Sequence, residues 1–153
     1  MNKKVNNKDS LYVYEVNTAD IKICIKDHKY VWLHLWRPYC SSEYCRNIDY
    51  FTDIEKKYML KDFKFFLISE TYDVKDIIET MKNVTYDKPI FVLMDSYYGH
   101  SMRKNNIKLL DELDNNLSLE RKYGYFDYLF KDTILIYVGR KITERILDSL
   151  IVN

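Results

Sequence analysis

The sequence predicts an α/β fold in which helices cover both faces of a mixed β-sheet, and three observations support it. A run of β-branched, aromatic and aliphatic residues at 30–36 is followed by a segment with helical spacing and by a second apolar run at 62–69. This order is typical of a right-handed parallel βαβ unit. Two strand-like runs, 124–130 and 133–138, are separated by only two residues, as in an antiparallel hairpin. A helical pattern over 142–151 ends the chain, and the combination predicts a mixed sheet.

The segment before the central strand is predicted to add further strands. Residues 1–10 are polar, so we expect them to be disordered or loosely attached, with residues 11–153 forming a single domain. Residues 11–16 and 21–26 alternate between apolar and polar side chains, which is the spacing of half-buried strands. Because only residues 27–29 separate the second run from the central strand, these two strands are predicted to be antiparallel neighbours.

The central strand, 30–36, is apolar along almost its whole length, as a strand buried on both faces would be. After a turn, residues 41–58 carry apolar side chains every three or four positions and are predicted as a helix. A second helix is predicted over 73–82. Residues 89–94 form a short strand whose leading proline fits an edge or a first position. The next segment contains a turn and a helix over 107–117.

Composition limits the classes of partner. A hydrophobic fraction of 47% and a charged fraction of 31% describe an ordinary globular protein. The net charge is +1 and the sequence has no basic stripe, so nucleic acid is not an expected partner. We find no apolar run long enough for a membrane span. The polar N-terminus lacks a signal-peptide pattern, which predicts a cytoplasmic protein as the chain stands. A missing upstream signal or lipoprotein segment would instead place the protein in the cell envelope or periplasm.

Two of the three cysteines form the candidate reactive site. Cys24 lies in an alternating run and is interpreted as a small filler, whereas Cys40 and Cys45 are close in sequence. Cys40 falls where the predicted helix begins, and the positive end of the helix dipole favours the thiolate over the thiol. In a continuous helix Cys45 would lie about 140° around the axis from Cys40, so a disulfide requires the first turn to unwind. No Cys-X2-Cys pair is present, so we expect no metal site and no cofactor.

This arrangement resembles the thioredoxin-like superfamily. Members of that family have a central strand that ends in an aromatic residue, then three residues and the attacking cysteine, and the run 35–40 (LWRPYC) has this spacing. The run 128–139 is similar to the family's final hairpin and its closing glycine. An insertion between 89 and 119 lies where larger redoxins carry one. The resemblance covers residues 30–151 and implies a three-layer α/β/α sandwich with a mixed central sheet and an insertion before the final ββα.

Three departures from the family bear on activity. The family's second cysteine follows the first after two residues, but Glu43 stands there and the partner has moved to Cys45, which gives C-x4-C in place of C-x2-C. The cis-proline that shapes the family's peptide site is expected near Gly124 or Tyr125, and neither is proline; Pro89 is an alternative position. The buried acid six residues before the attacking cysteine is replaced by His34.

The resemblance implies a thiol–disulfide oxidoreductase whose substrate is a protein disulfide or thiol. Cys40 would attack and Cys45 would resolve the mixed disulfide. Trp36, Arg37 and Pro38 would surround the thiol, and the charge of Arg37 would favour the thiolate. The oligomeric state is not indicated by the sequence.

Alternatives remain for several of these residues. His34 is either a proton relay or a hydrogen-bonded core residue. Glu43 either opposes thiolate formation or is a favourable acid in the first helical turn. A binding module of the same fold without turnover is the second reading, because the cis-proline is missing. A peroxiredoxin-like peroxidase is the third, because the run 40–45 (CSSEYC) resembles the cysteine spacing of some peroxiredoxins, although Arg37 stands where they place a threonine.

Overall fold

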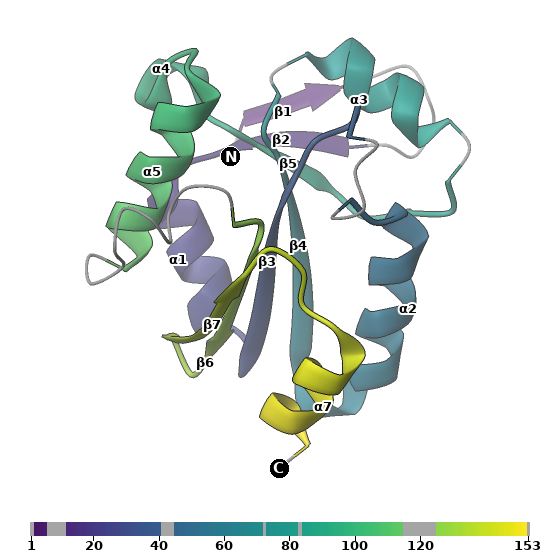
Figure 1. Ribbon diagram of the computed structural model, residues 1–153. Helices are drawn as coiled ribbons and strands as arrows, with labels where there is room; N and C mark the ends of the chain where they lie inside the picture. Colours follow the sequence, from purple (N-terminus) through teal and green to yellow (C-terminus); the bar gives the residue numbers. More distant parts are fainter. Residues whose placement is uncertain are drawn as a thin grey trace.

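The computed structural model describes residues 2–5, 12–40, 45–71, 73–82, 84–114 and 125–152, with the backbone alone described at 2–5. In this part of the chain a seven-stranded sheet has the order β1-β2-β5-β4-β3-β6-β7, and helices cover both of its faces (Figure 1). The strands are β1 (Asn2–Val5), β2 (Tyr12–Val16), β3 (Tyr30–Trp36), β4 (Phe63–Ser69), β5 (Ile90–Leu93), β6 (Asp127–Lys131) and β7 (Ile134–Gly139). The helices are α1 (Thr18–Lys26), α2 (Ile48–Tyr58), α3 (Val74–Met81), α4 (Asp95–Tyr98), α5 (Met102–Leu113) and α7 (Glu144–Ile151), with a short 3-10 segment η1 (Met59–Lys61).

The strand directions confirm the predicted mixed α/β sheet. Strands β2, β5, β4 and β3 are mutually parallel. Strand β6 pairs antiparallel with β3, and β7 pairs antiparallel with β6. The β6–β7 connection has positive φ at Asp132 (48°) and Thr133 (72°), as a two-residue type I′ turn requires. Both the parallel β3-α2-β4 unit and the final hairpin are therefore present as predicted.

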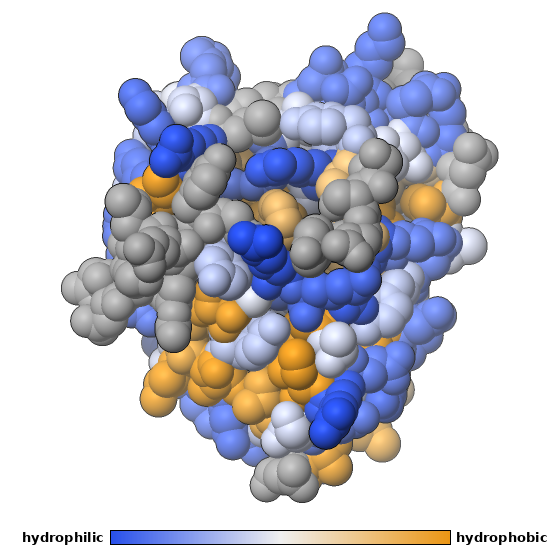
Figure 2. Space-filling model, viewed as in Figure 1, coloured by the Kyte–Doolittle hydropathy of each residue, from blue (hydrophilic) through white to orange (hydrophobic). Residues whose placement is uncertain are grey.

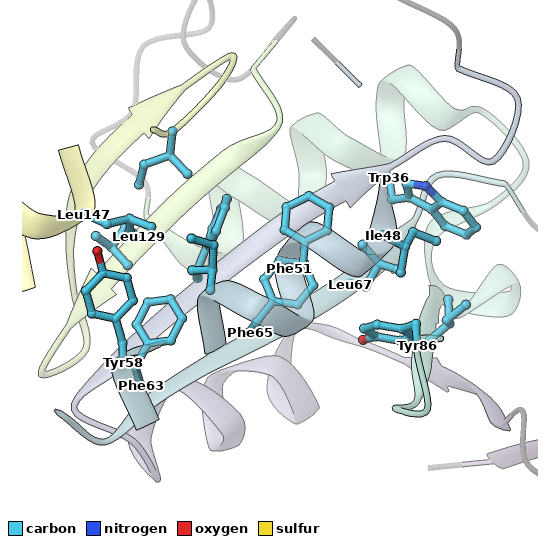
Figure 3. Packing of buried hydrophobic residues seen from close by; sticks show 14 of the residues in the cluster. Trp36, Ile48, Phe51, Tyr58, Phe63, Phe65, Leu67, Tyr86, Leu129 and Leu147 are labelled. Atoms are coloured by element: carbon cyan, nitrogen blue, oxygen red, sulfur yellow. The ribbon is translucent and has the colours of Figure 1, made fainter. Parts of the chain in front are cut away.

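Strand β3 lies inside the sheet, between β4 and β6, and separates two apolar layers. All seven of its residues are buried, because each face of the strand meets helices. Trp32 and Trp36 belong to the layer beneath α2, α3 and α7, and Figure 3 shows Trp36 within this layer. Leu33 and Leu35 belong to the opposite layer, beneath α1, α4 and α5. The carboxyl end of β3 is thus held rigidly from both sides.

The segment 21–26 is helical, and its prediction as a strand is wrong. Helix α1 begins at Thr18, after a capping box in which Asn17 and Asp20 exchange side-chain and backbone hydrogen bonds. Ile21 and Ile25 face the core, whereas Ile23 is 60% exposed. Over only six residues, the alternating run fits the two-residue period of a strand and also the 3.6-residue period of a helix. The capping box at Asn17 favours the helix. The connection at 27–29 therefore joins α1 to β3 and is not a hairpin.

Several boundaries also differ from the prediction. Helix α2 begins at Ile48, because the Asn47 side chain accepts the backbone N–H of Asp49 at 3.1 Å and caps it there. Helix α5 begins at Met102, before the predicted start at 107, and the predicted turn at 96–100 contains helix α4. Strand β5 begins at Ile90 and lies between β2 and β4, so Pro89 directly precedes an inner strand and does not lie on an edge strand.

The two outer strands of the sheet differ in character. The N-terminal segment was expected to be disordered or loosely attached, but Asn2–Val5 pair with β2 as strand β1, which gives the outer edge of β2 a hydrogen-bonding partner. At the opposite edge, Ile134 of β7 is 67% exposed. Figure 2 shows apolar side chains gathered over this hairpin region and α7.

No helix among the described residues is long and apolar enough to cross a membrane.

Candidate functional site

A disulfide joins Cys40 and Cys45 at the carboxyl end of β3, with their Cα atoms 5.9 Å apart. The backbone N–H of Cys40 donates to the carbonyl oxygen of Arg37 at 3.1 Å, which closes the turn that leaves the strand. Both cysteines are half-buried and precede the helix cap at Asn47. The bond therefore forms without any unwinding of α2, and ligands of parallel sheets bind at this edge.

The start of the helix after Cys40 differs from the prediction. Helix α2 begins at Ile48, so Cys40 does not directly precede the helix in sequence. Cys40 nevertheless lines the same pocket as Asn47 and Ile48 at the N-terminus of α2. The stabilisation of a Cys40 thiolate by the helix dipole stays a prediction, and Cys45 is the cysteine nearer to that terminus in sequence.

His34 forms a buried pair with Asp127, a residue that the sequence analysis did not single out. His34 is 4% exposed and Asp127 is 1% exposed, and the His34 Nδ1 atom lies 2.6 Å from Asp127 Oδ1. The same oxygen accepts the Trp32 indole N–H at 2.9 Å, and the other accepts the backbone N–H of Ile142 at 2.7 Å. Because a carboxylate accepts and does not donate, Nδ1 is the nitrogen that donates to Asp127, which leaves Nε2 as the ring atom available for proton exchange.

The histidine and the disulfide line the same small pocket, which has room for about one water molecule. His34 reaches this pocket from β3. The centre of its ring lies 4.6 Å from the centre of the Phe51 ring on α2. Asp127 reaches the histidine because β6 pairs with β3 in a register that places the two residues opposite each other. A lone acid at the start of an apolar strand was the available signal for Asp127. The register that brings it to His34 was not readable from the sequence.

A larger pocket of about 290 Å³ opens beside the disulfide, between the start of α2 and the end of α3. The Thr80 hydroxyl, from α3, donates to the carbonyl oxygen of Pro38 at 3.3 Å and so ties the wall of the pocket to the cysteine turn. A substrate group could approach the sulfur atoms from this side. The lining consists of Trp36, Arg37, Pro38, Cys40, Cys45, Arg46, Asn47, Ile48, Thr80 and Val84.

Arg37 is paired with a buried carboxylate. Its Nε donates to Glu70, which directly follows β4 and is 4% exposed. The side-chain amide of Asn106, on α5, donates to the other oxygen of Glu70. The Arg37 guanidinium also lies 5.3 Å from the centre of the Phe126 ring. The positive charge expected near the thiol is thus present, but Glu70 compensates it. Neither Glu70 nor Asn106 was predicted from the sequence, because the two residues come from segments far apart in the chain.

The remaining predicted site residues have different outcomes. Trp36 and Pro38 line the larger pocket. Tyr125 is half-buried just before β6, and its carbonyl oxygen accepts the Tyr128 hydroxyl at 3.2 Å. Glu43 and Gly124 lie outside the described residues. Within the described ranges, no group of three or more His, Cys, Asp or Glu side chains could hold a metal ion.

Comparisons with known proteins give no assignment. No protein-family model, no curated protein and no solved structure matches this chain.

Proposed function

We propose that this protein is a thiol–disulfide oxidoreductase with a thioredoxin-like arrangement of sheet and cysteines. The observation that carries the proposal is the half-buried Cys40–Cys45 disulfide after the end of β3, where it shares a pocket with His34, whose ring is paired with the buried Asp127. A disulfide next to a buried proton acceptor is suited to thiol exchange, because the attacking thiol must lose its proton.

The topology from β3 onward supports the thioredoxin-like part of the proposal. The chain passes through a parallel β3-α2-β4-α3-β5 segment and then through the antiparallel β6–β7 hairpin and helix α7. Helices α2 and α7 pack on one face of this core and α5 on the other. Strand β2, with α1, extends the sheet beyond β5. Cys40 and Cys45 follow β3, at the carboxyl end of the parallel strands, where we place the proposed reaction.

The proposed reaction is a balanced two-electron exchange. In the dithiol form, the Cys40 thiolate attacks one sulfur atom of a substrate disulfide, forms a mixed disulfide and releases the first substrate thiolate. The Cys45 thiolate then attacks the Cys40 sulfur atom, forms the Cys40–Cys45 bond and releases the second. The two protons of the cysteine thiols pass to the two leaving thiolates. The substrate disulfide is reduced to two thiols, and the protein dithiol is oxidised to the disulfide.

His34 is proposed to hold the proton that the attacking thiol loses. Its Nε2 atom is the basic position, because Asp127 fixes the proton on Nδ1. The burial of this pair excludes bulk water, so a proton released into the small pocket has His34 as a nearby acceptor.

Turnover by cysteine variants tests the proposal. Reduction of insulin disulfides by the reduced protein should be lost in Cys40→Ser, and Cys45→Ser should accumulate a mixed disulfide at Cys40. Cys24→Ser is the matched control and should be unchanged, because Cys24 is half-buried on α1 and lines neither pocket beside the disulfide. Turnover that survives in Cys40→Ser would overturn the assignment.

A binding module without turnover is the second candidate function. The pairing of Arg37 with Glu70 favours it, because a compensated arginine promotes a thiolate less than an uncompensated one does. In that case wild type and Cys40→Ser would be equally inactive in the insulin assay.

A further inference from the structure

Arg46 is a second arginine at the larger pocket, and its side chain is held in place by neutral groups. It lies between Cys45 and the helix cap at Asn47, and its guanidinium is 4.2 Å from the centre of the Tyr50 ring. One of its terminal N–H groups donates to the carbonyl oxygen of Ile142. The stacking and the hydrogen bond fix the direction of the side chain without cancelling its charge.

Arg46 has no ion-pair partner in the described part of the chain, whereas Arg37 on the same pocket is paired with Glu70. The Nε atom of Arg46 is buried and has no hydrogen-bond partner among the described residues. Asp49, three residues further on, is occupied elsewhere, because its carboxylate accepts the backbone N–H and the hydroxyl of Thr85. Glu144 and Asp127 lie close enough to the Tyr50 ring to act on its pKa, but neither pairs with Arg46. Arg46 is therefore the arginine of this pocket that no described carboxylate binds.

We propose that the larger pocket is a subsite for a carboxylate that lies within a few atoms of the substrate's disulfide, and that Arg46 binds it. This inference rests on the proposed oxidoreductase function and adds a substrate class to it. An arginine forms charge-assisted hydrogen bonds with carboxylates, often two at once. A volume of about 290 Å³ is near the lower end for small-molecule sites. The pocket therefore accepts one or two side chains, or a small thiol compound, and not a folded surface.

Three small disulfides of similar length and different charge test the subsite. These probes are 3,3′-dithiodipropionate, with two carboxylates, neutral 2-hydroxyethyl disulfide, and cystamine, with two ammonium groups. The rate of oxidation of the reduced protein by each probe is divided by the rate of the same probe with dithiothreitol, which removes the intrinsic reactivity of the leaving thiol. We expect the normalised rate to be about tenfold higher for the anionic than for the neutral probe and lowest for cystamine.

Arg46 variants show whether the selectivity comes from this residue. Arg46→Gln should remove the preference for the anionic probe, so that the normalised rates of the anionic and neutral probes become equal in this variant. Continued reaction with the neutral probe shows that the cysteine pair is intact. Arg46→Lys should retain part of the preference. Arg145→Gln removes the same charge from an exposed position on α7 outside the pocket and should have no effect, which separates local binding from long-range attraction.

The outcomes separate this inference from the proposed function. If the reduced wild type reacts with none of the probes faster than a free thiol does, the oxidoreductase proposal fails. If it reacts with all three at equal normalised rates, or if Arg46→Gln keeps the preference, only the carboxylate subsite is overturned.

The source of the carboxylate is distinguished by a further comparison. Glutathione disulfide is compared with two peptide disulfides that carry Glu or Gln next to the cysteine. A rate advantage of the Glu peptide over the Gln peptide that is lost in Arg46→Gln identifies an acidic protein segment. An Arg46-dependent advantage confined to glutathione disulfide identifies a small thiol compound. No Arg46 dependence in any of the three overturns the inference.

Discussion

Asp127 accepts hydrogen bonds in the core from the side chains of Trp32 and His34 and from the backbone of Ile142. Trp32 and His34 lie on β3, and Ile142 lies just before α7. The carboxylate of Asp127 therefore connects β6 to β3 and to the start of α7. A buried carboxylate is costly unless its oxygen atoms are hydrogen-bonded, and here both are. Asp127 therefore supports both the fold and the position of His34.

Replacement of Asp127 by Asn should lower the free energy of unfolding by about 2–3 kcal/mol. The amide nitrogen of Asn cannot accept a hydrogen bond, so at least one buried donor loses its partner. Urea denaturation of the oxidised protein measures this change. The exposed residue Asp53 on α2 is the control, and Asp53→Asn should change stability by less than about 0.5 kcal/mol. Equal effects of the two substitutions would show that the Asp127 contacts contribute little.

Replacement of His34 by Gln should slow substrate reduction about a hundredfold at neutral pH, because the nearby proton acceptor is lost. The deficit should shrink as the pH rises, since the thiol then ionises without help from a base. A merely structural histidine would give a deficit that is independent of pH. Rates measured from neutral to alkaline pH in wild type and His34→Gln distinguish these cases.

At the scale of elements, the segment that follows β3 is hydrogen-bonded to the segment that follows β4, next to the disulfide. Glu70 donates its backbone N–H to the Trp36 carbonyl oxygen at 2.8 Å, which extends the β3–β4 pairing beyond the strands. Its side chain holds Arg37, and Asn106 holds Glu70 from α5. The turn that carries Cys40 is therefore tied to β4 and to α5.

Replacement of Glu70 by Gln should accelerate alkylation of reduced Cys40 about threefold at neutral pH. The substitution removes a negative charge near the turn and leaves Arg37 uncompensated, and both changes favour the thiolate. The measurement uses a background of Cys24→Ser and Cys45→Ser, so that Cys40 is the only thiol. Glu144→Gln, at an exposed position on α7, is the matched control. A rate that is unchanged or lower in Glu70→Gln would show that Arg37 does not act on Cys40.

Most strands were predicted from the sequence, but α1 was taken for a strand and the start of α2 was placed too early, and both errors have a physical reason in capping. Strand β3 and the final hairpin were predicted because long apolar runs and a two-residue connection permit few alternatives. The run at 21–26 fits either a strand or a helix by alternation alone, and the capping box at Asn17 decides. In the same way, the apolar spacing after Cys40 continues through 41–58, but the Asn47 cap sets the start of α2 at Ile48.

At the scale of the whole molecule, five of the 15 tyrosines belong to the described buried core, namely Tyr30, Tyr58, Tyr86, Tyr98 and Tyr128. Burial raises the pKa of Tyr58 and of Tyr98 to about 12. The hydroxyl of Tyr58 also donates to Asp148 at 2.6 Å, which raises its pKa further. Burial likewise raises the pKa of Tyr86 and of Tyr128. These four phenols keep their protons in the folded protein at pH values where an unfolded chain loses them.

Stability should therefore fall in alkaline solution. Each phenol has a folded-state pKa above the unfolded value of about 10, so its contribution is fully present below about pH 10 and is lost as the pH rises towards 12. Phenolate absorbance of the native protein should show a late-titrating group of tyrosines that joins the main group in denaturant. A single transition near pH 10 for all tyrosines in the native protein would contradict this prediction.

The candidate site was predictable only where its residues are neighbours in sequence. Cys40, Cys45, Trp36, Arg37 and Pro38 follow one another around the end of β3, and the sequence placed them together. Asp127, Glu70 and Asn106 reach the site through the strand register and the packing of α5, which no local pattern encodes.

The redox activity of the Cys40–Cys45 pair can be measured by mass spectrometry of the cysteines across a series of glutathione redox buffers. We predict that Cys40 and Cys45 interconvert between dithiol and disulfide, with a mass difference of two hydrogen atoms, and that Cys45→Ser carries glutathione on Cys40 in the mapped peptides. A bond that does not respond to the buffer, or a Cys40 that stays unmodified in Cys45→Ser, would contradict the account.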